Sequence, residues 1–273
     1  MTRMRKIACI IMAIIVIMLA ACQKEQLGAE TAPYGVFIGI DHDNIGRLDK
    51  YETVVVEPTE FSKKEVEKLQ DKGKTVYAYL NIGTLETFRS YFDNFENITL
   101  GIYGDWPDEY WIDVSNQAWQ QYCLTLAEKI HKKGFDGYFI DNLDVYHYYP
   151  KTGIYEGICN ILRRIKSLNT EVIINGAKEF VTKTFSMGAG EDLFDAVNQE
   201  EVFTKINFDN ETYHNQSRKE TAVLKKYLKE VKKEGYDVYL LEYSPSKATA
   251  KKIKKYCDKN GFKYYCAKTL KLE

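Results

Sequence analysis

Residues 134–150 read GFDGYFIDNLDVYHYYP, and this stretch decides the fold. After a glycine it continues with three apolar residues, 138–140, a short run typical of a strand buried on both faces. Asp141 ends the run, and Asn142 and Asp144 follow within a loop rich in aromatic rings. A carboxylate at the end of a buried strand indicates that the strand delivers it to a site shared with other strands.

Seven further runs of this kind are rich in Val, Ile, Tyr and Phe, and they cover residues 34–41, 53–58, 75–83, 171–177, 194–200, 237–244 and 262–268. Between the runs, amphipathic patterns predict helices at residues 62–72, 116–133, 153–168, 217–234 and 246–260. Four of these helices are followed by a glycine, the residue preferred where a helix exits in a left-handed turn, namely Gly73, Gly134, Gly235 and Gly261. Strands and helices therefore alternate along the chain.

Alternating strands and helices predict a parallel sheet, and eight such units favour a closed (β/α)8 TIM barrel over residues 34–273. A barrel of this type typically needs about 250 residues, which this stretch nearly supplies. An open doubly wound sheet is the alternative, but the chain contains neither G-x-G-x-x-G nor G-x-x-x-x-G-K-[ST]. No Pro-, Gly- or Ser-rich linker divides the stretch, so we expect a single domain.

The first 21 residues are typical of a signal peptide, with a basic start, an apolar run and small residues before Cys22. The segment resembles a bacterial lipoprotein signal, which implies cleavage before Cys22, lipidation of that cysteine and a tether over residues 22–33. An uncleaved transmembrane anchor is the alternative, but the apolar run is shorter than the ~20 residues that span a bilayer. We expect an extracytoplasmic domain attached to a membrane by its lipid.

Loss of residues 1–21 would remove three basic side chains and change the formal net charge from −1 to −4. That balance argues against a nucleic-acid partner, which would need a basic face. Four cysteines then remain without the spacing of metal ligands, so we predict no metal site. We also expect no cofactor, and we expect a monomer. Cys257 and Cys266 could pair, or all four could be reduced and buried; these are Cys123, Cys159, Cys257 and Cys266.

The predicted strands end in acidic or amide side chains, namely Asp41, Glu57, Asn81, Asp141, Asn175, Asn198, Glu200 and Glu242. The active site of a TIM barrel lies at the carboxyl ends of its strands, so we expect these side chains to converge. Any one strand-end aspartate is more often a helix cap, but this many converging carboxylates without histidine ligands favour hydrolysis of a glycosidic bond. Rings that could stack on sugars are Tyr103, Trp106, Tyr110, Trp111, Tyr146, Tyr148 and Tyr149.

Glu200 and Glu201 compete for the place at the end of the sixth strand. Strand side chains alternate between the two faces, so Glu200 shares its face with Asn198, whereas Glu201 shares its face with Val197. A polar neighbour suits the cavity wall and an apolar neighbour suits the helix layer. The pattern favours Glu200, and Gln199 on the other face weakens the contrast.

Five segments together resemble glycoside hydrolase family 114, the endo-α-1,4-polygalactosaminidase-like family: VYAYLNIGTLE, YWIDVSNQAW, GFDGYFIDNLDVY, INGAKEFV and AVNQEEVFT. The resemblance implies a (β/α)8 barrel whose catalytic pair falls on Asp141 and Glu200, and an α-1,4-linked galactosamine polymer as substrate. Asp141 would be the nucleophile or base and Glu200 the general acid. Side chains expected to contact the sugar are Asp41, Asn81, Asp113, Asn142, Asp144, Tyr146, Asn175, Glu201 and Glu242.

Two other functions stay open. A barrel could bind an exopolysaccharide without cutting it, but both carboxylates of the expected pair are present here. A hydrolase of a neutral α-glycan would keep the chemistry and change the substrate. The acidic strand ends favour a cationic amino-sugar polymer, since they would attract it electrostatically.

Overall fold

The computed structural model describes residues 32–104 and 106–273. Residues 33–273 form one compact unit with its own hydrophobic core. The predicted signal peptide, the lipidation site Cys22 and all but the last two residues of the predicted tether lie outside the described residues.

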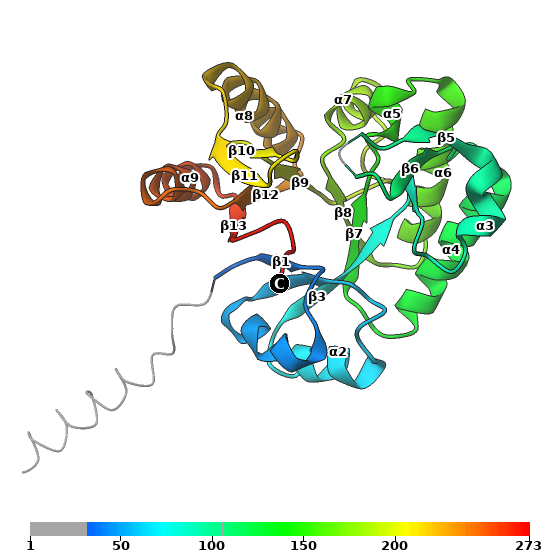
Figure 1. Cartoon of the computed structure of the whole chain (residues 1–273), viewed down its shortest axis with the longest axis horizontal. Coiled ribbons are helices and arrows are strands. Elements are labelled where there is room, and N and C mark those ends of the chain that lie inside the picture. The colour runs from blue at the N-terminus through cyan, green and yellow to red at the C-terminus, as the bar shows by residue number, and fades with distance from the viewer. Residues whose placement is uncertain (1–31, 105) are drawn as a thin grey trace, which may run out of the picture. The chain divides into compact units, whose positions relative to one another are not determined.

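Eight parallel strands form a nearly closed barrel, which confirms the predicted TIM fold. Their order in the sheet is β1-β2-β3-β7-β8-β9-β12-β13. Figure 1 shows them at the centre of the unit with helices around them. The strands span Gly35–Phe37 (β1), Thr53–Val56 (β2), Thr75–Asn81 (β3), Gly137–Asp141 (β7), Glu171–Asn175 (β8), Ala196–Glu200 (β9), Asp237–Tyr243 (β12) and Lys263–Ala267 (β13).

Side-chain and backbone contacts join β1 to β13 and bring the two ends of the sheet together. The rings of Phe37 and Tyr265 lie 5.1 Å apart, and the Gly39 N–H donates to the Leu272 carbonyl at 3.2 Å. The strands are buried on both faces, as in β2, where Val54, Val55 and Val56 are all fully buried. This two-sided burial explains why the runs are continuously apolar.

The five predicted helices are present, and side-chain caps start several of them. Asn116 accepts from the Ala118 and Trp119 N–H groups at 2.9 and 3.2 Å, and such caps satisfy N–H groups that a helix start leaves unpaired. At the exit of the second helix, Gly134 has φ +85°, as its sequence position predicts. The helices span Lys63–Gln70 (α2), Gln117–His131 (α4), Thr152–Lys166 (α6), Arg218–Lys233 (α8) and Lys247–Asn260 (α9).

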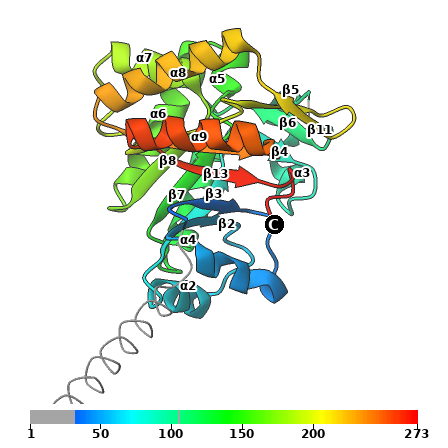
Figure 2. The same ribbon diagram turned by 90° about the vertical axis from the view of Figure 1, so that its left-hand side faces the viewer.

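Two insertions that the sequence pattern did not predict lie after strand ends. An antiparallel sheet in the order β4-β6-β5 follows β3, and the β10–β11 hairpin follows β9. Figure 2 shows both on the side toward which the barrel strands point. Their strands are Thr84–Glu86 (β4), Thr99–Ile102 (β5), Glu109–Ile112 (β6), Thr204–Asn207 (β10) and Thr212–Asn215 (β11). Further helical segments are His42–Lys50 (η1), Phe92–Phe95 (α3), Glu96–Ile98 (η2), Val145–Tyr148 (α5) and Lys178–Ser186 (α7).

The first strand is shorter than predicted, because it ends at Phe37 and not at Asp41. The Asp41 carboxylate instead accepts from the Asn44 N–H at 3.0 Å and from the Asn44 side chain at 2.8 Å. Aspartate is favoured at this position because it satisfies a free N–H group of the helix start. Asp41 is therefore an exposed cap of η1 and lies outside the strand.

Candidate active site

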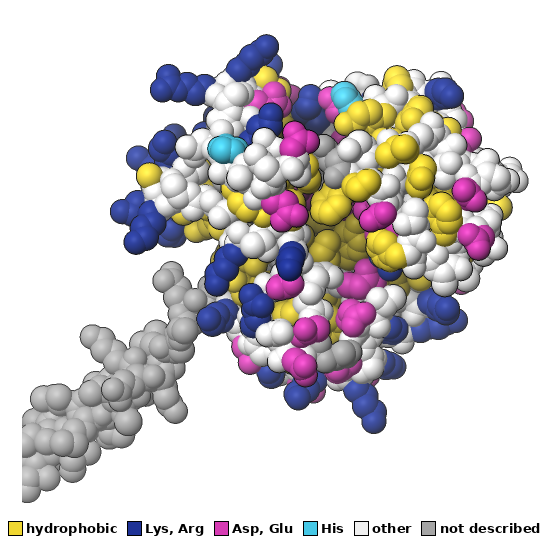
Figure 3. Space-filling model, in the orientation of Figure 1, with side chains coloured by type: hydrophobic (Ala, Val, Ile, Leu, Met, Phe, Trp, Pro, Cys, Tyr) yellow, Lys and Arg dark blue, Asp and Glu magenta, His cyan; other side chains and the backbone are white. Residues whose placement is uncertain are grey.

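A cavity of about 1080 Å³ opens at the carboxyl ends of the barrel strands. Of the side chains that line it, eleven are acidic and three are Lys or Arg, so the cavity has a strongly negative potential. Figure 3 shows acidic and apolar side chains around the hollow at the centre of this face. The acidic lining residues are Glu57, Glu60, Glu86, Asp108, Glu109, Asp141, Asp144, Glu179, Glu200, Glu201 and Glu220.

Asp141 and Glu200 share one hydrogen-bond donor in this cavity. The Asn175 side-chain Nδ2 donates to Asp141 Oδ1 and to Glu200 Oε1, at 2.8 Å in both cases. The Tyr79 hydroxyl donates to the other Asp141 oxygen at 2.8 Å, and the Tyr243 hydroxyl donates to the other Glu200 oxygen at 2.8 Å. Each carboxylate is thereby held on both oxygens by groups from neighbouring barrel strands.

Burial changes the acidity of both members of this pair. It raises the pKa of Glu200 to about 7, helped by the negative charge of Asp141 and opposed by the donors on Asn175 and Tyr243. Burial also raises the pKa of Asp141 above its ordinary value, although three hydrogen-bond donors favour its ionised form. Two carboxyls with different environments can serve as acid and nucleophile at the same pH.

A second group of acids lines the wall that the β4–β6 sheet contributes. The Arg89 guanidinium donates to Glu86 at 2.5 Å and pairs with Glu57 at 3.3 Å. Glu109, the cross-strand neighbour of Glu86, accepts from the Thr84 hydroxyl at 2.8 Å, and burial raises its pKa to about 7. Arg89 therefore neutralises only part of the acidic wall.

Three of the residues predicted to bind sugar lie beside Asp141 and Glu200. Asn142 and Asp144 follow β7 and line the cavity. Burial raises the pKa of Asp144 to about 6, while the Ala177 N–H, 3.1 Å from its carboxylate, opposes the shift. Asn175 also lines the cavity, but its amide nitrogen is already used by the two carboxylates.

Glu201 lines the cavity as well, but its carboxylate has a different partner from that of Glu200. It accepts from the Ile206 N–H of the β10–β11 hairpin, and its backbone has φ +57°. The left-handed residue ends β9, so consecutive side chains no longer point as a regular strand would place them. Of the two glutamates, Glu200 is the one that shares a donor with Asp141.

Five predicted sugar contacts do not line the large cavity, and each makes hydrogen bonds elsewhere in the barrel. Glu242 is fully buried and accepts from the Phe203 and Thr204 N–H groups at 2.8–3.1 Å. Asp113 accepts from the Ser115 N–H at 3.0 Å. The large cavity is lined by none of Asp41, Asn81, Asp113, Tyr146 and Glu242, so the expectation that they share it was wrong.

Tyr146 and Asn81 are kept out of the large cavity by contacts with nearby residues. The Tyr146 ring packs against Tyr155 at 5.6 Å, and Lys183 donates to its hydroxyl at 2.9 Å. Asn81 accepts from the Gly83 and Thr84 N–H groups at 3.2 and 3.1 Å, which turns the chain from β3 into β4. Asn81 lines only a smaller neighbouring cavity.

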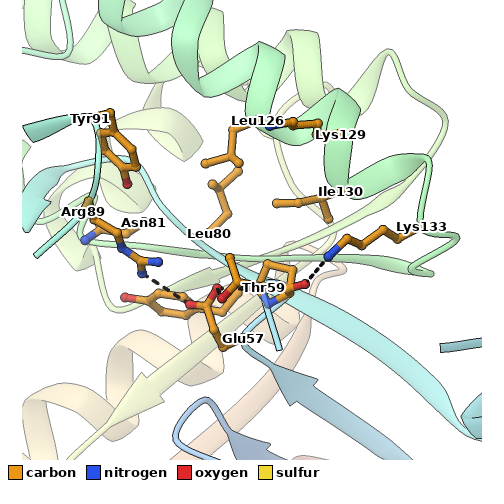
Figure 4. A pocket seen from close by; sticks show the side chains of 12 residues that line it. Glu57, Thr59, Leu80, Asn81, Arg89, Tyr91, Leu126, Lys129, Ile130 and Lys133 are labelled. Carbon is orange, nitrogen blue, oxygen red and sulfur yellow. Dashed lines mark hydrogen bonds and ion pairs between the residues drawn. The ribbon is translucent and has the colours of Figure 1, made fainter. Parts of the chain in front are cut away.

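The smaller cavity has a volume of about 290 Å³ and lies between the loop after β2 and helix α4. Figure 4 shows Leu126 and Ile130 on one side and the Arg89–Glu57 ion pair on the other. Lys133 donates to the Pro58 carbonyl at 2.6 Å and holds the loop in place. Residues common to both cavities form the wall between them, namely Glu57, Thr59, Tyr79 and Arg89.

Aromatic rings from both insertions meet at the large cavity. Trp106 of the β5–β6 loop and Phe208 of the β10–β11 hairpin both line it, and their rings lie 5.8 Å apart. Tyr103 and Tyr148 also line it, and each packs on Trp111. The sequence pattern indicated Trp106, Tyr103 and Tyr148 but missed Phe208, whose signal was the FDNET turn at residues 208–212 between two alternating segments.

Cys123, Cys159, Cys257 and Cys266 are all free thiols. Across residues 32–104 and 106–273, no three His, Cys, Asp or Glu side chains form a group that could hold a metal ion. In the same part of the chain, every helix is too short or too polar to span a bilayer.

Comparison with curated proteins finds partial relatives. One is an uncharacterized protein of Methanocaldococcus jannaschii, 31% identical over 34% of this chain and 28% of its own length. Another is an uncharacterized protein of Deinococcus radiodurans, 26% identical over 48% of this chain and 47% of its own length. The chain thus matches less than half the length of these relatives.

Solved structures give matches over nearly the whole chain. The glycoside hydrolase domain of PelA from Pseudomonas aeruginosa is 17% identical, with a TM-score of 0.74 over 90% of this chain and 96% of that one. Ega3 from Aspergillus fumigatus, solved in complex with galactosamine, is 16% identical, with a TM-score of 0.67 over 90% and 94%. At such identities the likeness concerns the fold. Because the model of one family matches residues 37–272, the chain belongs to glycoside-hydrolase family GH114.

Proposed function

We propose that this glycosidase cuts an α-1,4-linked, galactosamine-containing polysaccharide within its chain, with Asp141 as nucleophile and Glu200 as general acid. The observation that carries the proposal is the shared donor Asn175, which holds both carboxylates at the strand ends of an acidic cavity. The raised pKa of Glu200, about 7, keeps a proton available for the leaving oxygen near neutral pH.

The geometry supports a two-step reaction that retains the anomeric configuration. Glu200 would protonate the glycosidic oxygen while Asp141 attacks the anomeric carbon and forms a glycosyl ester. Water would then attack that carbon, give its proton to Glu200 and release Asp141. Because one nitrogen of Asn175 bonds to both oxygens, Asp141 Oδ1 and Glu200 Oε1 can be no farther apart than twice 2.8 Å. This fits the ~5–5.5 Å of retaining enzymes better than the ~6.5–9.5 Å of inverting ones.

Charge supports an amino-sugar polymer as the substrate. A deacetylated galactosamine unit carries an ammonium group, and the acidic lining of the cavity would attract a chain of such units. The structural neighbour Ega3 was solved with galactosamine. Exposed rings at the cavity, such as Trp106 and Tyr148, offer faces on which sugar rings could stack.

The test is to incubate residues 33–273, the compact unit, with partly deacetylated α-1,4-galactosaminan and to follow the products by mass spectrometry. Short oligomers would support an endo-acting enzyme, and proton NMR of the first products would show whether their new reducing ends are α. Binding without cleavage would favour a carbohydrate-binding barrel, and neither binding nor cleavage would reject the substrate.

Salt should weaken the binding of a cationic polymer to this cavity. The Debye length falls from about 10 Å at 0.1 M to 3 Å at 1 M, so attraction by acids around the cavity is screened. We expect KM for deacetylated polymer to rise several-fold over this range while kcat changes little. Initial rates at each salt concentration measure this, and a fully acetylated polymer is the control. Equal salt responses for both polymers would contradict the charge argument.

Activity should follow a bell-shaped pH profile. Glu200 must be protonated to act as the acid, so the rate should fall as pH rises through about 7. Asp141 must be ionised to attack, and its raised pKa places the acid limb above the range usual for an aspartate. Since the two groups interact, the limbs report the pair together. A rate that keeps rising above pH 8 would rule out Glu200 as the acid.

We also propose, from the sequence alone, that Cys22 is lipidated and holds the barrel at the outer face of a membrane. The tether of residues 22–33 would then keep the cavity near the cell surface, where it meets a secreted polysaccharide. Expression of the full chain and of Cys22→Ala, followed by separation of membrane and soluble fractions, tests this. Equal partition of both proteins would reject the anchor.

A further inference from the structure

A chain of buried side chains runs through the barrel interior to the catalytic pair. Asn198 Nδ2 donates to Asn175 Oδ1 at 2.7 Å, and the Tyr34 hydroxyl donates to Asn198 Oδ1 at 3.2 Å. Asn175 and Asn198 are paired residues on the adjacent strands β8 and β9. Tyr34 and Asn198 are fully buried, and Asn175 is 7% exposed.

The direction of every hydrogen bond in this chain follows from its end at the carboxylates. Ionised Asp141 only accepts, so the Asn175 atom that contacts it, and that also contacts Glu200, must be the NH2 group. Its carbonyl oxygen therefore faces Asn198, which must present its own NH2 group. The carbonyl of Asn198 then faces Tyr34, whose hydroxyl must donate. Only one orientation of the two amides satisfies all the partners.

We propose that Asn198, oriented by Tyr34 and acting through Asn175, is the positioning residue that fixes the separation of the two catalytic carboxyls and the hydrogen bonds that stabilise their ionised forms. The roles of Asp141 and Glu200 rest on the proposed function; the orientation of the amides does not. Asn198 does not line the cavity and is fully buried, so it has no route to the substrate.

An inverted Asn175 shows why the orientation matters. If its amide turned over, a carbonyl oxygen would face two carboxylates and repel them apart. The same N–H donors also lower the pKa of Asp141 and of Glu200, because they stabilise the ionised forms. Loss of the Asn198 donor leaves the Asn175 carbonyl unpaired and removes the bond that holds this side chain in place between the two carboxyls. Both carboxyls should then separate and hold their protons more tightly, so both limbs of the pH profile should move to higher pH.

The decisive experiment compares Asn198→Leu with Asn198→Asp. Leucine has a similar size and cannot donate, so kcat at the pH optimum should fall about 100-fold, the loss that a misplacement of about 1 Å produces. A protonated aspartate can donate to Asn175 and accept from Tyr34, as asparagine does. Asn198→Asp should therefore stay within about 10-fold of the wild type at pH 5, and it should lose activity as pH rises and the introduced carboxyl ionises.

Tyr34→Phe removes the donor at the far end and should lower kcat about 10-fold with KM little changed. Its matched control is Tyr138→Phe, which removes another buried tyrosine hydroxyl, here bonded to the Ala127 carbonyl at 2.7 Å in the helix layer. Equal kcat for both tyrosine variants would overturn the proposal. So would equal losses for the leucine and aspartate variants at pH 5 while both melt as the wild type does.

A titration without substrate separates this proposal from the proposed function. Carboxyl 13C NMR of Asp141 and Glu200 measures the pKa of each group whether or not the protein cleaves a polymer. Asn198→Leu should raise both values relative to the wild type. Unchanged values would reject the positioning role, whereas raised values in a protein that cuts no galactosaminan would reject only the substrate.

Discussion

Asp141→Asn is expected to lower kcat at least about 10⁴-fold, and Glu200→Gln about 10²–10⁴-fold, the range found for general acids. Asparagine cannot form the glycosyl ester, so the first loss should be nearly complete on every substrate. Glutamine cannot protonate the leaving oxygen, so the second loss should shrink on substrates whose leaving group needs no proton. Release of oligosaccharides and of a nitrophenol from an aryl glycoside measures the two effects.

Glu201→Gln is the matched control for this pair. Glu201 is the next residue, lines the same cavity and accepts from the hairpin N–H of Ile206, so its variant should stay within about 10-fold of the wild type. Activity that survives in Glu200→Gln but not in Glu201→Gln would move the acid by one residue. If Asp141 is the nucleophile, azide should restore turnover of an aryl α-glycoside in Asp141→Ala with the inverted, β-configured glycosyl azide as product, whereas any azide product of Glu200→Ala should keep the α configuration.

The largest effect on stability is expected at Glu242. Its buried carboxylate accepts from the Phe203 N–H and from the N–H and hydroxyl of Thr204, with the hydroxyl at 2.6 Å. Glu242→Leu would leave three buried donors unpaired, and each costs about 1–3 kcal/mol. We expect the free energy of unfolding to fall by at least about 3 kcal/mol, measured by urea unfolding of residues 33–273.

Glu242→Gln should cost less, because its carbonyl oxygen can still accept from one or two of these donors. Glu230→Ala on the exposed face of α8 is the control for loss of a glutamate and should change stability by less than about 0.5 kcal/mol. The bonds to Glu242 also hold the start of β10, whose hairpin carries Phe208 to the cavity. A Glu242→Leu protein as stable as Glu230→Ala would show that this carboxylate does not hold the hairpin.

The alternation of side chains along β12 could have predicted that Glu242 does not face the cavity. In β12 the Tyr239 ring packs on Tyr34 inside the barrel, and the Tyr243 hydroxyl reaches Glu200. Residues two apart share a face, so Glu242 must point to the other side. By the same rule Tyr79 shares a face of β3 with Asn81, two residues later. Tyr79 could therefore have been predicted to reach the cavity, where its hydroxyl donates to Asp141. The polar residues near the strand ends, taken without this rule, placed Glu242 wrongly and did not include Tyr79.

Asp41 and Asp113 show that a carboxylate near a strand end need not face the active site. Each accepts from N–H groups of its own next turn, and that local bond competes with any role at a distance. The insertions were missed for another reason. Residues 84–112 and 204–215 form antiparallel strands of only three or four residues, which are too short for an alternating pattern to identify.

The sequence by itself determined the eight strands, the helices between them and the barrel, because apolar runs and helix caps are local and repeat along the chain. The family was indicated separately, by five segments that resemble it. The strand ends indicated a group of polar residues that includes Asp141 and Glu200, since parallel strands bring their carboxyl ends together, and the family resemblance singled out these two. Only the tertiary structure decided which polar groups share a hydrogen bond. Asn175 lies between two carboxylates, and Glu242 holds a hairpin, because side chains far apart in the sequence meet there and must satisfy one another away from water.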